Sequence, residues 1–206
     1  MIYDSEPWRN LLLTSAQDLT KRAATKRVTE RRSIFTERTV FFAAYAMRKL
    51  DDSKKLSTSW RGTTVSCMRY PPTDTQWGWL ERDHLDQHYA LEKSQIDNMG
   101  ARAFCDLVVH SLIFNEYIND NKTIGGFFIT SDNTKTRGIW QFELDTIVRL
   151  MRRTAEDWPS EAYFIRNPTT GEMEVWAGNS EPPAAWKEKA KKFAQQRASL
   201  ARPKVG

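Results

Sequence analysis

The stretch Met99-Gly-Ala-Arg-Ala-Phe-Cys-Asp-Leu-Val-Val-His-Ser-Leu-Ile-Phe-Asn-Glu-Tyr117 decides the expected fold. Its apolar residues recur at helical intervals over a wide arc, which is typical of a helix in the middle of a protein. Arg102, Asp106 and His110 stand four residues apart, so a regular helix places all three on one stripe. We therefore predict a core helix over residues 99–117 and look first to its polar stripe for chemistry.

The N-terminal part is expected to be helical as well. No Pro or Gly interrupts the chain between Pro7 and Gly62, which allows one long helix or a hairpin of two helices. The apolar stripe fades over residues 21–33, where basic side chains point all round the axis, and it returns from Ile34 to Leu50. Residues 21–33 should thus project into solvent or lie against something negative.

The rest of the chain contains strand patterns, because β-branched and aromatic residues alternate with polar ones between turn signals. The expected elements are a strand at Thr63–Tyr70, a helix from Trp77 or Trp79 to Lys93, a hairpin of Ile124–Thr130 and Gly138–Leu144, a helix capped by Asp145, a second hairpin of Ala162–Arg166 and Met173–Ala177, and a lysine-rich helix from residue 184 or 185 to about 201.

These elements predict an α+β protein. It has a helical N-terminal half with a long helix or helical hairpin, a C-terminal antiparallel sheet of four to five strands, and a basic C-terminal helix. We expect a single domain over residues 1–206, with a helical part at about 1–118, a β-rich part at about 119–183 and a basic helix or tail at 184–206.

The composition indicates whether the chain folds and where in the cell it is expected. Forty per cent of the 206 residues are apolar and eight are Trp, which is typical of a folded chain. We find neither a long uncharged apolar stretch nor a basic leader with an apolar block, so we expect a soluble, cytoplasmic protein. Cys67 and Cys105 show no paired metal spacing and are expected to be buried free thiols.

The net charge of +5 is unevenly distributed. Residues 20–55 carry eleven Lys/Arg against four Asp/Glu, residues 184–204 carry seven against one, and the remainder is acidic. Two basic ends favour an anionic partner, with nucleic acid first and an acidic protein second, although solvated helix faces would show the same composition. The expected nucleic-acid-binding residues are Lys21, Arg22, Lys26, Arg27, Arg31, Arg32, Lys187, Lys191 and Lys192.

The histidines suggest a metal site as an alternative. His84 and His88 stand four residues apart, so on a helix their imidazoles face the same way, as two metal ligands require. His110 could complete the set, with Asp106 or Glu92 as an oxygen ligand. A metal-dependent hydrolase is therefore one hypothesis, although such pairs of histidines also arise by chance on exposed helices.

The segment Arg82-Asp-His-Leu-Asp-Gln-His88 supports another alternative. It resembles the Arg-(Asn/Asp/His)-x4-His signature of HEPN-type ribonucleases, which are common among toxins and antiviral (phage) defence proteins. The resemblance implies an all-helical fold and RNA cleavage without metal, usually at a dimer interface. It implies that Arg82 stabilises phosphate charge and that His88 is the acid or base, for which imidazole is suited.

His110 and Asp106 are further catalytic candidates, but a buried histidine bonded to a carbonyl or to Asp106 is the more common arrangement. The chain has no phosphate-binding Gly-rich loop and no dinucleotide fingerprint, and its cofactor is unknown from the sequence. Our leading hypothesis is a small basic binding protein that acts on or beside nucleic acid, as a homodimer or as a subunit of a larger complex. An enzyme using Arg82, His88, His110 and Asp106 is the competing class.

Overall fold

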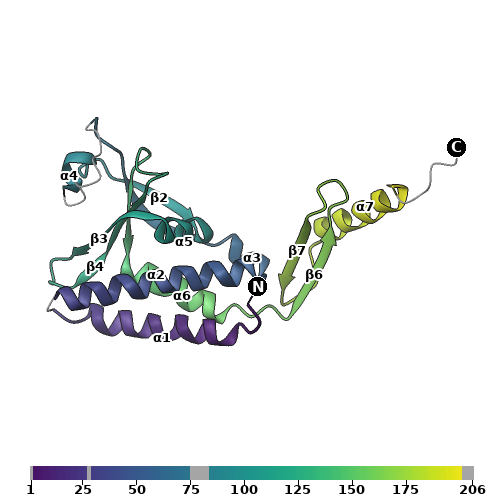
Figure 1. The fold of residues 1–206 in the computed structure, drawn as a ribbon, viewed down its shortest axis with the longest axis horizontal. Helices are drawn as coiled ribbons and strands as arrows, with labels where there is room; N and C mark the ends of the chain where they lie inside the picture. Colours follow the sequence, from purple (N-terminus) through teal and green to yellow (C-terminus); the bar gives the residue numbers. More distant parts are fainter. Residues whose placement is uncertain (1, 27–28, 75–83, 201–206) are drawn as a thin grey trace.

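A computed structural model describes residues 2–26, 29–74 and 84–200, and it shows the expected α+β architecture (Figure 1). The helices are α1 (Glu6–Ala23), α2 (Glu30–Asp52), α3 (Thr58–Arg61), α4 (Leu85–His88), α5 (Ala101–Val109), α6 (Leu144–Glu156) and α7 (Ala184–Leu200). The strands are β1 (Thr64–Tyr70), β2 (Gln95–Gly100), β3 (Ser111–Ile118), β4 (Ile124–Ser131), β5 (Ile139–Glu143), β6 (Glu161–Arg166) and β7 (Met173–Gly178).

The N-terminal part is a hairpin of two helices, one of the two predicted possibilities. Pro7 lies in the first turn of α1, where its missing N–H is not needed, and Leu12, Ala16 and Leu19 on its inner face are fully buried. The hydroxyl of Thr29 caps α2 by accepting from the backbone N–H of Arg32 at 3.3 Å. The chain therefore reverses between residues 24 and 29, inside the basic segment.

The predicted core helix is correct only over its first half. It ends at Val109 as α5, and Ser111–Ile118 forms strand β3 instead. Apolar residues in 111–118 fit either period, but this run contains the β-branched and aromatic residues that fit a strand, and β4 pairs with it antiparallel. Helix α5 still lies in the core, in contact with α2 on one side and with strand β4 on the other.

Strands β2-β1-β5-β4-β3, in that order, form the antiparallel sheet in the described residues. Helices α1, α2, α5 and α6 gather on one face, over a core that includes Phe104, Phe127 and Phe142 (Figure 1). A smaller apolar cluster around Tyr89 and Ile113 is separate from this core. Gly126 allows β4 and β5 to approach, since a Cβ there would lie 1.9 Å from the carbonyl oxygen of Phe142.

Three further details of the structure differ from the prediction. Strand β2 was not predicted, because its polar residues have low strand propensity and only its pairing with β1 makes it extended. The helix expected from Trp77 or Trp79 to Lys93 is present only as the single turn Leu85–His88, while residues 75–83 lie outside the described part. Asp145 lies in the first turn of α6, whose N-cap is Glu143.

The second predicted hairpin is confirmed, as β6 and β7, but it forms its own two-stranded sheet rather than joining the main one. It extends away from the body and carries α7 at its far end (Figure 1). The hydroxyl of Thr58 holds it to the body by accepting from the backbone N–H of Ala177 at 2.9 Å. We refer to residues 161–200 as the C-terminal arm.

Buried groups complete the core. Both cysteines are free and buried, as expected, and burial raises the pKa of the Cys67 thiol to about 12. The side chains of Trp140 and Trp176 are also buried. None of the helices in the described residues has the length and apolar character needed to cross a bilayer.

Candidate nucleic-acid interface

The reversal between α1 and α2 is built around one buried arginine. Arg32 is only 7 % exposed, and its guanidinium donates to the carbonyl oxygens of Thr25 at 2.5 Å and Ala23 at 3.4 Å. These carbonyls lie at the C-terminal end of α1, where backbone acceptors lack intrahelical donors and the helix dipole attracts a cation. Arg32 thus serves the fold, and its guanidinium is largely removed from solvent.

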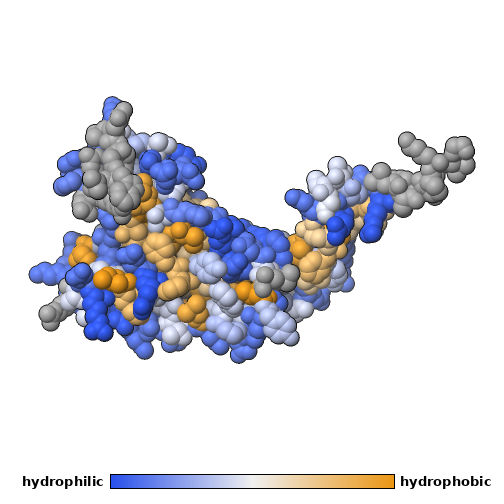
Figure 2. Space-filling view, viewed as in Figure 1, coloured by the Kyte–Doolittle hydropathy of each residue, from blue (hydrophilic) through white to orange (hydrophobic). Residues whose placement is uncertain are grey.

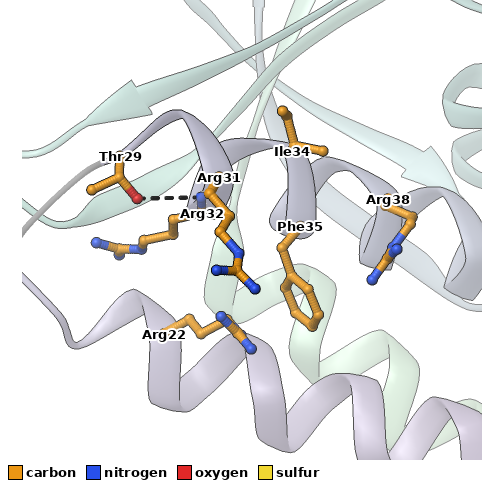
Figure 3. A pocket seen from close by; sticks show the side chains of 7 residues that line it. All are labelled: Arg22, Thr29, Arg31, Arg32, Ile34, Phe35 and Arg38. Carbon is orange, nitrogen blue, oxygen red and sulfur yellow. Dashed lines mark hydrogen bonds between the residues drawn. The ribbon is translucent and has the colours of Figure 1, made fainter.

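The other arginines of the segment surround an open pocket of about 530 Å³. Arg22 reaches it from α1, while Arg31 and Arg38 reach it from α2 (Figure 3). The guanidinium of Arg22 lies 3.7 Å from the ring centroid of Phe35, and that of Arg38 lies 5.4 Å from it. The lining is Arg22, Thr29, Arg31, Arg32, Ile34, Phe35 and Arg38, without any carboxylate.

We define the N-terminal basic surface as Lys21, Arg22, Lys26, Arg31 and Arg38. All five are exposed, and within the described residues none of them forms an ion pair with a carboxylate. Their charges are therefore free to act on an incoming anion. Arg27, which was also expected to bind, lies outside the described residues.

The C-terminal basic residues have a different environment. The ammonium groups of three α7 lysines pair with carboxylates of the same arm: Lys187 with Glu181, Lys189 with Glu174 at 2.5 Å and Lys191 with Glu188 at 3.1 Å. Lys192 is exposed. Much of the positive charge that the sequence concentrates in α7 is therefore offset locally.

Arg102, Asp106 and His110 do lie together, as their spacing predicted, but as part of an ionic network between α2 and α5. Arg102 donates to Asp106 at 3.2 Å and to Asp51 at 3.1 Å. Burial opposes ionisation of Asp52, but the bond from Arg102 and the charges of Arg102 and Arg48 hold the pKa of Asp52 below its usual value. The polar side chains of α5 therefore hold this helix to α2 through ion pairs.

His110 takes part in the same network. Arg48 contacts Asp106 at 3.2 Å and His110 Nε2 at 3.1 Å. A guanidinium can only donate, so Nε2 accepts and the ring proton lies on Nδ1. His110 and Asp106 also border a cavity of about 490 Å³ that includes Trp140 and Arg137. In this arrangement the basic nitrogen of His110 is already engaged, which leaves its catalytic role a prediction.

His84 and His88 receive little support as metal ligands. His84 precedes α4, whereas His88 is on α4 and is 1 % exposed. Among the described residues, no group of three or more His, Cys, Asp or Glu side chains could hold a metal ion.

The ribonuclease resemblance also needs revision. Its all-helical expectation is wrong, since the protein contains a five-stranded sheet. Arg82 lies outside the described residues, and the roles of Arg82 and His88 stay predictions.

Sequence reasoning missed two members of the site, Phe35 and Arg38. The available signal was the spacing of Arg31, Phe35 and Arg38, which alternates charge and an aromatic ring at three and four residues along one helix. Phe35 had been expected to lie in the apolar stripe of the helix. It is instead half-buried beneath the guanidinium of Arg22.

Comparisons with known proteins add no relative: no protein family, no curated protein and no solved structure matches this chain.

Proposed function

We propose that this protein binds nucleic acid non-specifically through the N-terminal basic surface, with phosphate groups entering the pocket formed by Arg22, Arg31 and Arg38. The observation that carries the proposal is the convergence of three exposed guanidinium groups from two helices, with no carboxylate in the lining. Guanidinium groups bind phosphate oxygens through planar pairs of N–H donors, so the chemistry of the site suits a polyanion.

Two further features support phosphate as the ligand. Phe35 restricts the guanidinium of Arg22 through a cation–π contact, so less side-chain freedom is lost on binding. Arg32 keeps the reversal between the helices closed, which fixes the relative positions of Arg22 and Arg31. Phe35 and Arg32 thus partly pre-organise an anion site on the surface. Such a site contacts phosphate groups, which carry no sequence information, and therefore suits non-specific binding.

The proposal is tested by the salt dependence of binding. The triple variant Arg22→Gln, Arg31→Gln, Arg38→Gln should lose at least about tenfold in affinity for a fluorescent oligonucleotide at low salt, and each lost phosphate contact should reduce the slope of log K against log salt by about 0.7–0.9. Arg32 is left intact because its role is in the fold.

The matched control removes the same charge from the other end. Lys187→Gln, Lys191→Gln, Lys192→Gln should bind almost as the wild type does, because two of these lysines are already paired. Unchanged affinity in the arginine variant would refute the proposal, and so would equal losses in both variants. Binding to an acidic protein with no binding to oligonucleotides would favour the second partner class.

We also propose that the protein is cytoplasmic and is part of a larger complex.

Two measurements distinguish this binding function from the enzymatic alternatives. Degradation of RNA that is lost in His88→Ala would support the ribonuclease, and stoichiometric metal in the purified protein would support the hydrolase.

A further inference from the structure

The N-terminal basic surface continues along helix α2 as an exposed stripe that mixes cations and aromatic rings. Starting from Arg38, positions 42, 45 and 49 follow at intervals of four, three and four residues, which is the spacing of one helix face. The side chains of this stripe are Arg31, Ile34, Arg38, Phe42, Tyr45 and Lys49, of which Lys49 is half-buried and the others are exposed.

The two aromatic residues of the stripe are unusually exposed for their size. Phe42 is 57 % exposed and Tyr45 is 44 % exposed, although the opposite face of the same helix, at Val40, Ala43 and Met47, is fully buried. Apolar and charged residues lie side by side over the α1–α2 region in the space-filling view (Figure 2). The exposed parts of these two rings are therefore accessible to a ligand.

The rings are placed close to the phosphate-binding arginines. One helical turn separates Arg38 from Phe42, a rise of about 6 Å, and Tyr45 follows after about 4.5 Å more. The ring of Tyr45 also has the ammonium group of Lys49 6.0 Å from its centroid and the ring of Trp8 at 6.2 Å. Cations thus stand at both ends of a short aromatic platform.

We propose that the nucleic acid bound here is single-stranded, with its phosphates at Arg22, Arg31 and Arg38 and its bases stacked on Phe42 and Tyr45. This inference rests on the proposed function. A duplex keeps its base faces inside the stack and can use only the cations, whereas an unpaired strand offers base faces to exposed rings. Arg31 and Arg38 in this stripe form no ion pair with a carboxylate among the described residues, so the charge at this end favours a polyanion over a purely apolar partner.

The first measurement needs no variant. Fluorescence anisotropy compares the full chain with a labelled 20-nucleotide poly-dT strand and with a duplex of the same length at equal salt. We expect the single strand to bind about tenfold more tightly, since one base–aromatic stack contributes roughly that factor. Equal affinity, or a preference for the duplex, overturns the inference and leaves the proposed function standing, whereas no binding to either probe refutes both.

The second measurement removes the rings. Phe42→Leu with Tyr45→Leu should lower affinity for the single strand at least about tenfold while affinity for the duplex changes less than twofold. Phe164→Leu is the matched control, since Phe164 is also 57 % exposed but lies on β6, and it should leave both affinities unchanged.

Circular dichroism confirms that the double variant retains its fold, as exposed positions should allow. Parallel losses for both probes, or no loss for either, contradict base stacking. A wild type that binds vesicles of phosphatidylcholine and phosphatidylserine through Phe42 and Tyr45, with no preference for the single strand, would assign the stripe to a membrane surface and overturn the inference.

Discussion

The two basic ends of this protein are alike in composition and different in structure. At the N-terminal end, exposed cations from α1 and α2 converge on one pocket without carboxylates, whereas three lysines of α7 pair with carboxylates of the C-terminal arm. The charge that a partner meets depends on where the counter-charges lie, so a count of basic residues overestimates the field of α7. Three arginines without ion pairs line the pocket at the N-terminal end, against two arginines, Arg166 and Arg197, in the carboxylate-free pocket of the arm, so among the described residues we propose the N-terminal end as the anion site.

The largest effect is expected within the N-terminal end itself. Arg32→Ala should destabilise the protein by about 2–3 kcal/mol, because it leaves the carbonyl oxygens of Ala23 and Thr25 without their charged donor. Arg31→Ala, one residue away but exposed, should change stability by less than about 0.5 kcal/mol. Urea unfolding of both variants tests whether the basic run divides into one structural and several binding residues. Equal losses would mean that this division is wrong.

Sulfate should stabilise the protein by binding at the N-terminal pocket, and the lysines of α7 should not contribute to this effect. Three like charges around one pocket repel each other, so a bound sulfate relieves that repulsion, and sulfate at ten times its Kd should stabilise the wild type by about 1.4 kcal/mol. Sulfate also stabilises proteins in general, and the variant Arg31→Gln, Arg38→Gln measures that background.

Thermal unfolding with and without sulfate makes the comparison between the two ends. Lys191→Gln with Lys192→Gln should respond as the wild type does. If the pocket variant gains as much stability from sulfate as the wild type, the anion does not bind in the pocket.

The C-terminal arm should become attractive to polyanions once its carboxylates are removed. Glu174→Gln, Glu181→Gln and Glu188→Gln together release three lysines, and we expect oligonucleotide affinity at low salt to rise about threefold, with a steeper salt slope. Because exposed ion pairs contribute little to stability, the arm should stay folded. Anisotropy titrations provide the test, and an unchanged slope would show that the three pairs do not mask α7.

The sequence was sufficient for the fold class and insufficient for parts of its detail. Strong periodicity identified a helical N-terminal part, without deciding between one long helix and a hairpin, and it identified β1, both hairpins and α7. It failed at Ser111–Ile118, where short apolar spacing fits a helix and a strand equally and pairing with β4 decides. It also failed at β2, a polar strand that only its partner β1 makes extended.

Only part of the candidate site could be predicted, because the sequence shows which residues are basic but not which of them are buried or in contact. Charge density pointed to residues 21–33, and Arg22 and Arg31 do line the pocket. The burial of Arg32 could not be predicted, because it depends on the chain reversing and presenting the carbonyl end of α1. Arg38 was beyond the segment considered, and its position beside Phe35 depends on a contact between side chains. The sequence shows where basic residues cluster, but the tertiary structure decides which of them pair with a carboxylate.

The smallest effect concerns a carboxylate of β3, Glu116, which lies near the N-terminal basic surface through its contact with Ser33. Glu116 on β3 is half-buried, and burial raises its pKa although Ser33 donates to it at 2.8 Å. A carboxyl whose pKa is raised in the folded state contributes stability that is complete below its unfolded pKa, near 4.3, and is lost as pH rises through the folded value. Glu116→Gln should therefore match the wild type near pH 4 and gain a few tenths of a kcal/mol over it at pH 7.5, the gain being small because the group is only partly buried. Urea midpoints at the two pH values measure the difference. A wild type that gains on the variant as pH rises would mean that Glu116 neutralises the basic surface, and the contrast between the two ends would then be weaker than we infer.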